Sequence, residues 1–125
     1  MKGAELLVRC LEHEGVRLLF GLPGEETLAL TDALLDSGIR FVACRHEQGA
    51  AFMADVHGRL TGRAGVCLGT LGPGATNLVT AVADAYLDRA PLVALTGQAE
   101  LERQHKESHQ YIDVINLMDP ITSMY

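Results

Sequence analysis

The sequence has few of the residues that nucleic-acid or membrane binding needs. It contains no tryptophan, aromatic residues make up only 5%, and its 16 acidic residues outnumber its 10 lysines and arginines, for a net charge of −6. Base stacking on single-stranded nucleic acid needs aromatic side chains, and contacts to phosphates or anionic lipids need clustered cations. We therefore expect neither nucleic acid nor a membrane among the partners of this chain.

Cysteine is sparse, and no targeting segment is evident at the N-terminus. Cys10, Cys44 and Cys67 are odd in number, have no metal-ligand spacing and lie in apolar runs. This pattern predicts small buried side chains in a reducing compartment. Charges such as Glu5 and Arg9 interrupt the first apolar segment, which argues against a signal peptide or a membrane span. We expect a cytoplasmic protein.

The composition is that of one globular domain with many turns. The 125 residues are 48% hydrophobic and 21% charged, values that suit a single folded domain. The chain has 13 glycines, about half again the usual share. We expect these glycines in tight loops on a regular scaffold.

Short apolar runs alternate with segments of helical period. The runs predict strands at 16–20, 39–43, 64–70, 91–96 and 121–125. The intervening apolar spacing predicts helices that include residues 4–11, 27–34, 50–57 and 75–82. Strand centres recur about every 25 residues, which is typical of βα units in a parallel sheet. The predicted fold class is α/β, a Rossmann-like parallel sheet with helices on both faces.

Three parts of this pattern carry more specific expectations. The run 91–96 is apolar on both faces, which favours a central strand covered on both sides. The polar stretch 99–113 holds no single period and is interpreted as a partly helical excursion. Residues 121–125 resemble a fifth strand that nothing afterwards covers.

The residues that follow the strands are the first place to look for a ligand site, because open α/β sheets bind ligands at the carboxyl ends of their strands. Glycine-rich loops there allow backbone N–H groups to approach a ligand. The segment from Gly72 to Asn77 resembles a dinucleotide loop, but its spacing is GxGxxN and residues 96–98 supply no acidic side chain. A classical NAD site is therefore disfavoured, and a purely structural turn is the alternative.

Glu47 is the candidate that stands out. It begins a helix at a strand's carboxyl end, and Gly49, Ala50, Ala51 and Ala54 leave the first turns of that helix nearly bare. The simple interpretation is a carboxylate that complements the helix dipole. The functional interpretation is a carboxylate in an apolar pocket that exchanges a proton with a ligand nitrogen.

The histidines are weaker candidates. His46 is either a catalytic base or a hydrogen-bonded strap beside its charged neighbours. His57 is expected to pack at a helix end. His105 and His109 are four residues apart, but no third ligand is evident, so no metal site is expected.

Taken together, the motifs resemble the pyrimidine-binding (PYR) domain of thiamine diphosphate enzymes, in the acetolactate synthase and pyruvate oxidase branch. The resemblance covers the whole chain, residues 1–125. Its motifs are FGLPGEE at 20–26, RHEQGAAFMAD at 45–55, GRLTG at 58–62, GVCLGTLGPGATNLVTAVADAYLDRAPLVALTGQ at 65–98 and HQYIDVINLMDPIT at 109–122. It implies the thiamine diphosphate-binding fold of PYR type.

The resemblance also implies roles for individual residues. Glu47 matches the catalytic glutamate that hydrogen-bonds N1′ of the cofactor's aminopyrimidine ring and so helps to activate the cofactor for attack on a 2-oxo acid such as pyruvate. The other positions that match cofactor-binding residues are Pro23, Gly24, Thr70, Gly72, Pro73 and Asn77. His109 and Gln110 match the substrate side.

The chain departs from the family pattern at three places. His109-Gln110-Tyr111 stands where Phe-Gln-Glu is usual, which leaves the acceptor substrate open. PGEE replaces PGG at 23–26, and His57 stands where Tyr is frequent. The GDG motif of the PP domain, which holds the diphosphate and Mg²⁺ in this family, does not occur. FAD in the full enzyme is left open.

These departures set the expectations for the chain as a whole. We expect a PYR domain, incomplete at its C-terminus, that is inactive alone and needs a PP domain of the same or another chain. Homodimerisation is expected through the Ala-rich helix after Glu47 and the apolar helix 75–86. The alternatives are a split-enzyme PYR subunit and a non-catalytic dimerising module. In the non-catalytic alternative, the small-residue helix 47–60 is the dimer surface.

Overall fold

The computed structural model describes residues 1–103, 106 and 108–124 as an α/β fold around one parallel sheet. Its strands are β1 (Leu18–Gly21), β2 (Arg40–Ala43), β3 (Gly65–Gly69) and β4 (Leu92–Thr96), in the spatial order β2-β1-β3-β4. The α-helices are α1 (Gly3–His13), α2 (Leu28–Leu35), α3 (Glu47–Thr61), α4 (Pro73–Thr76), α5 (Val79–Leu87) and α6 (Val114–Met118). Short 3₁₀ helices are η1 (Glu25–Thr27), η2 (Leu101–Arg103) and η3 (Asp119–Ile121). The predicted fold class is confirmed.

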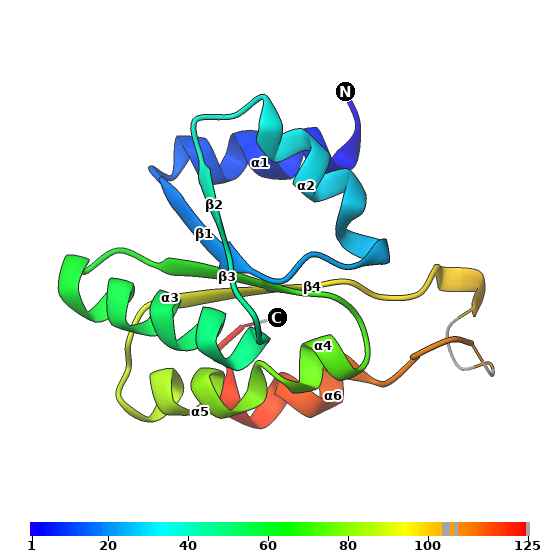
Figure 1. The fold of residues 1–125 in the computed structure, drawn as a ribbon. Coiled ribbons are helices and arrows are strands. Elements are labelled where there is room, and N and C mark those ends of the chain that lie inside the picture. Colours follow the sequence, from blue (N-terminus) through cyan, green and yellow to red (C-terminus); the bar gives the residue numbers. More distant parts are fainter. Residues whose placement is uncertain (104–105, 107, 125) are drawn as a thin grey trace.

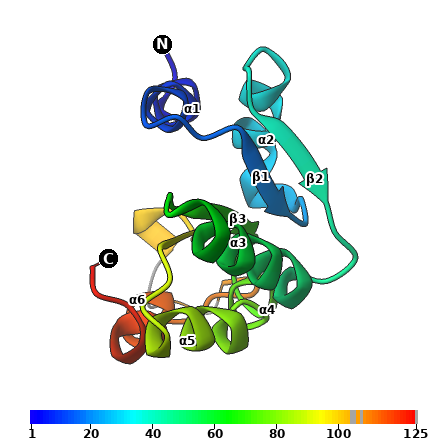
Figure 2. The same cartoon turned by 90° about the vertical axis from the view of Figure 1, so that its left-hand side faces the viewer.

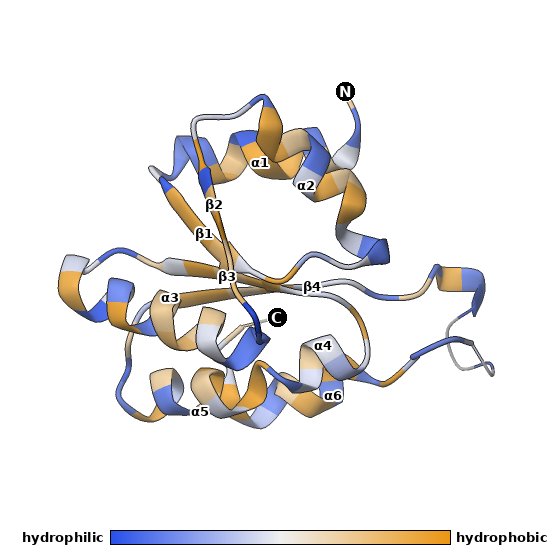
Figure 3. Ribbon diagram, viewed as in Figure 1, coloured by the Kyte–Doolittle hydropathy of each residue, from blue (hydrophilic) through white to orange (hydrophobic). Residues whose placement is uncertain are grey.

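Helices cover both faces of the sheet, as Figures 1 and 2 show: α1 and α2 lie on one face, and α3 to α6 lie on the other. Successive strand side chains point to opposite faces, so Leu19 of β1 packs in the core under α1 and α2, and Phe20 packs in the core under α3 and α5. Colouring by hydropathy shows apolar residues on the strands and on the helix surfaces turned toward them (Figure 3).

Strand β3 is the centre of the sheet, and all five of its residues are buried. It pairs with β1 on one side and β4 on the other. Helix α3 lies so close to it that a Cβ atom on Gly65 would come within 1.9 Å of the backbone oxygen of Ala54. A side chain at position 65 would therefore force the helix away from the sheet.

Arg59 fastens α3 to α5. Its Nε donates to Oδ1 of the buried Asp55 at 2.9 Å, and its other nitrogens reach Asp84 and Asp88 across the helix pair. The hydrogen bonds to Asp55 and Asp88 raise the pKa of the Arg59 guanidinium, so the side chain keeps its positive charge. The buried Asp55 carboxylate thereby has its partner, which a charge in that position requires.

The structure corrects three predicted elements. Residues 121–125 were expected to form a fifth strand, but Ile121 ends η3 and 122–124 are irregular, while Tyr125 lies outside the described residues. The run 91–96 was expected to be central, but β4 is an edge strand here, and Val93 is 39% exposed. The helix predicted around 75–82 is divided into α4 and α5, because the chain turns at Asn77 and Leu78.

Only one of the three cysteines is fully buried. Cys67 lies inside β3, Cys44 is half-buried after β2, and Cys10 is exposed on α1, so the prediction was wrong for Cys10. Burial, with a smaller contribution from the neighbouring Cys44, raises the pKa of the Cys67 thiol to about 12. None of the helices in the described part of the chain has the length and apolar character to cross a membrane.

The contact between α3 and β3 predicts that replacing Gly65 destabilises the protein far more than replacing Gly49. Gly65→Ala should lower the free energy of unfolding by about 3 kcal/mol or more, since its methyl meets a backbone oxygen that cannot move aside. Gly49→Ala on α3, where the new Cβ meets nothing within 4 Å, is the control and should leave stability unchanged or raise it by up to about 1 kcal/mol. Urea unfolding measures both, and equal losses would contradict the packing.

The Cys67 thiol predicts a pH dependence of stability. Because its pKa is raised from 9.0 to about 12 in the fold, the neutral thiol is favoured, and its stabilisation is complete below pH 9 and declines above it. Relative to Cys67→Ala, the wild-type chain should lose about 2 kcal/mol of unfolding free energy between pH 9 and 11. Urea unfolding at pH 8, 9, 10 and 11 tests this, and parallel profiles for the two chains would refute it.

Candidate functional site

The loops that follow β1, β3 and β4 lie together at the edge of the sheet formed by the carboxyl ends of the strands. The β3 loop lies between the other two. A Cβ atom on Gly24, after β1, would come within 2.4 Å of Cβ of Thr70, after β3. One on Gly97, after β4, would come within 3.3 Å of the backbone nitrogen of Leu71. Because both glycines lack a side chain, three loops meet closely in the region where parallel sheets bind ligands.

Glu47 is buried at this edge, with 5% of its surface exposed. It is the first residue of α3, where the positive end of the helix dipole favours a carboxylate. Its Oε2 accepts a hydrogen bond of 2.8 Å from Nδ2 of Asn77, which follows α4. The position of Glu47 agrees with the dipole interpretation, but its burial and its specific partner exceed what a solvent-exposed capping charge needs.

The second carboxylate oxygen of Glu47 faces Gly74. Oε1 lies 3.3 Å from the point that a Cβ atom on Gly74 would occupy, and within the described part of the chain it accepts no hydrogen bond. One oxygen is thus anchored and the other is available. A carboxylate in this state can accept a hydrogen bond from a ligand or share a proton with a ligand nitrogen.

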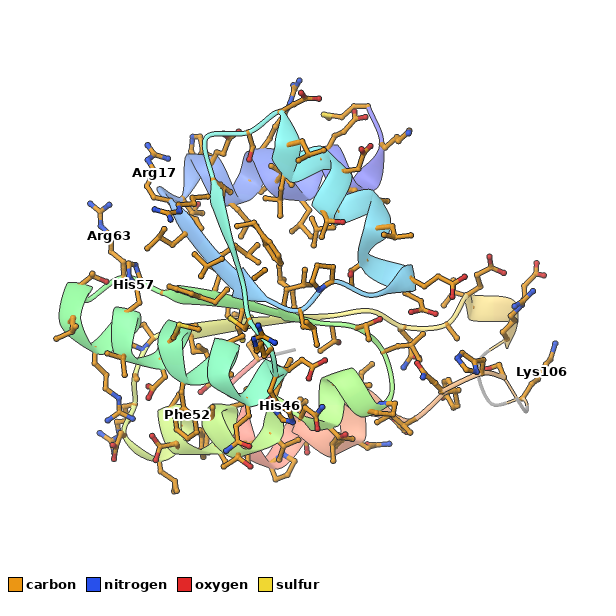
Figure 4. All side chains as sticks on the ribbon, viewed as in Figure 1. Arg17, His46, Phe52, His57, Arg63 and Lys106 are labelled. Carbon is orange, nitrogen blue, oxygen red and sulfur yellow. The ribbon has the colours of Figure 1, made fainter. Side chains whose placement is uncertain are left out.

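His46 acts as a helix cap. Its Nδ1 accepts from the backbone N–H of Gln48 at 3.1 Å, and Figure 4 shows it at the start of α3, with His57 farther along that helix. The strap interpretation of His46 is the one that its geometry supports. His57 packs near Phe20, with 6.2 Å between the ring centroids, as expected for a side chain on the sheet-facing side of the helix.

The Gly72 turn packs against the segment that carries Gln110. Gly72 has φ 57° and ψ −121°, a conformation that L side chains rarely adopt. A Cβ atom on Gly72 would come within 2.3 Å of the carbonyl oxygen of Gln110, whose own φ is 55°. The glycine is therefore required twice, for its backbone angles and for the contact with the segment that carries Gln110.

The remaining predicted residues lie around this centre. Pro23 is exposed in the loop after β1, Pro73 begins α4, and His109 is exposed in the turn that also contains Gln110. His105 lies outside the described residues, so the suggestion that it pairs with His109 stays untested. Among the described residues, no group of three histidine, cysteine or acidic side chains is gathered as a metal site.

Sequence reasoning missed Glu26. Its Oε2 accepts a hydrogen bond of 2.9 Å from Oγ1 of Thr70, 44 residues along the chain, and its Cβ lies against Gly97. The unusual PGEE motif drew attention to this position but offered no partner for it, because the bond joins two strand-end loops that only the sheet brings together.

Comparison with known proteins gives a consistent result. Residues 1–117 match the family described as "Thiamine pyrophosphate enzyme, N-terminal TPP binding domain". A probable acetolactate synthase large subunit of Methanocaldococcus jannaschii is 50% identical over 98% of this chain and 21% of the relative. Acetolactate synthase isozyme 2 large subunit of Escherichia coli is 47% identical over 94% and 21%, and acetolactate synthase of Bacillus subtilis is 48% identical over 97% and 21%. The chain thus spans about a fifth of the length of these relatives.

The bond between Asn77 and Glu47 predicts a stability effect. Asn77→Ala should lower the free energy of unfolding by about 1–3 kcal/mol, because it leaves a buried carboxylate oxygen without its donor. Adding Glu47→Gln should recover part of that loss, since a neutral amide is cheaper to bury than a carboxylate. Urea unfolding of the single and double variants gives the coupling, and strictly additive effects would contradict it.

Proposed function

The chain belongs to the thiamine pyrophosphate enzyme family as its N-terminal TPP binding domain, and from that premise we propose that Glu47 receives the pyrimidine ring of thiamine diphosphate. The observation that carries the proposal is the state of its carboxylate, buried, held by Asn77 on one oxygen and open on the other. In this proposal Oε1 shares a hydrogen bond with N1′ of the aminopyrimidine ring.

The residues around Glu47 fit such a ring. Gly74 leaves the space in front of Oε1 without a side chain, and Gly24 lets the β1 loop approach Thr70. The Gly72 turn packs against Gln110, and Pro73 begins α4 directly after it. A flat heteroaromatic group needs this kind of close approach to backbone, and small residues provide it. We assign Pro23, Gly24, Thr70, Gly72, Pro73 and Asn77 to cofactor binding.

Thiamine diphosphate, when bound, supplies the electron sink for breaking a bond next to the carbonyl of a 2-oxo acid. The part of this chain is to orient the ring and to hold a proton at the Glu47 carboxylate. Only 5% of the surface of Glu47 is exposed, so its carboxylate is largely shielded from water. We assign His109 and Gln110, in the turn whose Gln110 contacts Gly72, to the substrate side.

The whole protein, in this proposal, is an acetolactate synthase-like enzyme that decarboxylates and ligates 2-oxo acids such as pyruvate. The names of the similar relatives support this, and these relatives are about five times longer than this chain. The diphosphate and Mg²⁺ would be held by a PP domain, on the same or another chain, and FAD is a further candidate group. The three free cysteines support a reducing, cytoplasmic location.

We further propose a homodimer formed through α3. Gly49, Met53, Val56 and Leu60 recur at spacings of four, three and four residues and are all exposed, with Leu60 at 81%. Such spacing places them in one stripe along the helix, and an exposed apolar stripe is the kind of surface that a second helix covers. A dimerising module without catalysis would use the same stripe, so dimerisation alone does not separate the two alternatives.

We also propose that the sheet continues beyond β4. A hollow of about 1420 Å³ runs along α5, β4 and α6, and Glu47 is not among its lining residues. Leu92, Val114 and Met118 line it, so its walls are substantially apolar. An edge strand beside an apolar groove is where a further strand and its helix would add.

The role of Glu47 predicts a selective loss of activity. In the full-length enzyme built on this domain, Glu47→Gln should reduce turnover by at least about a hundredfold while leaving the fold intact, because the amide cannot exchange the proton. Steady-state kinetics and circular dichroism measure the two properties, and unchanged turnover would refute the assignment. Glu25→Gln, an exposed carboxylate on the β1 loop, is the matched control and should be near wild type.

The chain alone is expected to bind the cofactor weakly, since the proposed diphosphate and Mg²⁺ ligands lie on a PP domain. Calorimetric titration of the 125-residue chain with thiamine diphosphate and Mg²⁺ should give a Kd weaker than about 1 μM, and tighter binding would overturn this division of the site. Restoration of tight binding by a separate chain with a GDG motif would favour the split-enzyme alternative.

A further inference from the structure

Thr70 is held between two glycines at the mouth of the site. Its Cβ and Oγ1 lie 2.4 and 2.5 Å from the point that a Cβ atom on Gly24 would occupy, and its methyl group lies 2.7 Å from the corresponding point on Gly74. The methyl group also lies 2.8 Å from the Gly24 point, so it lies between the β1 loop and α4, whereas the hydroxyl lies against the β1 loop. Contacts with Gly24 and Gly74 on its two sides therefore restrict the orientation of the Thr70 side chain.

Glu26 fixes that orientation. Its Oε2 accepts the Thr70 hydroxyl hydrogen at 2.9 Å, and its own Cβ lies 3.1 Å from the point that a Cβ atom on Gly97 would occupy. The stem of Glu26 is thus pressed against the β4 loop while its carboxylate reaches the β3 loop. A hydrogen bond to an ionised carboxylate is stronger than one between neutral groups, so it can select one threonine rotamer.

The orientation matters because of what lies on the other side of Gly74. The Thr70 methyl and Oε1 of Glu47 both lie next to the same point, 2.7 and 3.3 Å from it. Rotation of Thr70 by one staggered step about χ1 would put the hydroxyl where the methyl now is. A hydroxyl in that place would lie beside Gly74, the residue that the available oxygen of Glu47 also borders.

We propose that Glu26 is a positioning residue that keeps the Thr70 hydroxyl away from Glu47. The inference rests on the proposed function, because the oxygen it protects is the one assigned to the pyrimidine ring. With Glu26 in place, the Thr70 branch beside Gly74 is a methyl group, which has no hydrogen to donate to Oε1. Without it, Thr70 becomes a competing donor to the same oxygen.

The first test measures the Thr70 rotamer in the 125-residue chain and needs no cofactor. Three-bond NMR couplings to the Thr70 methyl carbon report χ1 directly. Glu26→Ala should shift χ1 away from its wild-type rotamer, whereas Glu26→Gln, whose amide oxygen still accepts, should retain that rotamer. Glu25→Ala, next to it in η1 and exposed, is the matched control. An unchanged rotamer in Glu26→Ala would overturn the proposal.

The second test measures thiamine diphosphate affinity in the full-length enzyme by calorimetry. Glu26→Ala should weaken binding on the order of tenfold, the effect of one competing hydrogen bond. Thr70→Val replaces the hydroxyl by a methyl group, so in the Thr70→Val background Glu26→Ala should cause no further loss. The same loss in both backgrounds would show that Glu26 acts without Thr70 and would overturn the proposal.

The two tests separate this inference from the proposed function. If the wild-type enzyme does not bind thiamine diphosphate, the assignment of Glu47 fails, while the rotamer result still decides whether Glu26 orients Thr70. If the wild-type enzyme binds and Glu26→Ala binds equally well, the assignment of Glu47 stands and the role of Glu26 fails.

Discussion

The close contact between α3 and β3 is the constraint on which the rest of this structure depends. Gly65 lets the backbone oxygen of Ala54 lie where a side chain would otherwise be, and buried alanines face the same strand. Because the helix is pressed onto the centre of the sheet, its first residue is fixed at the carboxyl edge. Glu47 is buried for this reason, and a looser helix would leave it as an ordinary capping charge in solvent.

The site is then built by the loops that the sheet gathers at that edge. Glycine at positions 24, 72, 74 and 97 removes side chains from the places where the loops meet one another. Two hydrogen bonds between these loops, from Asn77 to Glu47 and from Thr70 to Glu26, orient the polar groups that remain. Backbone proximity and directed side chains together leave one carboxylate oxygen open beside a bare backbone.

Much of the fold could be predicted from local patterns. The helical period around residues 4–11 and 50–57 and the apolar runs of the first four strands gave the right elements, because period and turn residues are local properties. The fifth strand was wrong: ITSMY is apolar enough for a strand, yet Ile121 ends η3, which packs against α5, and residues 122–124 form no strand. The predicted central position of β4 was wrong. Apolar residues on both faces of a strand indicate that both faces are covered, but they do not indicate how many strands lie beside it.

For the site, the sequence by itself determined which chemistry is present, a glutamate opening a small-residue helix and glycine-rich loops after strands. Its motifs and relatives also determined the family. Only the tertiary structure decided how those groups pair: Asn77 with Glu47 across 30 residues and Thr70 with Glu26 across 44. The physical reason is that hydrogen bonds of this range depend on the order of strands in the sheet, since strand order places loops side by side and no local pattern encodes it.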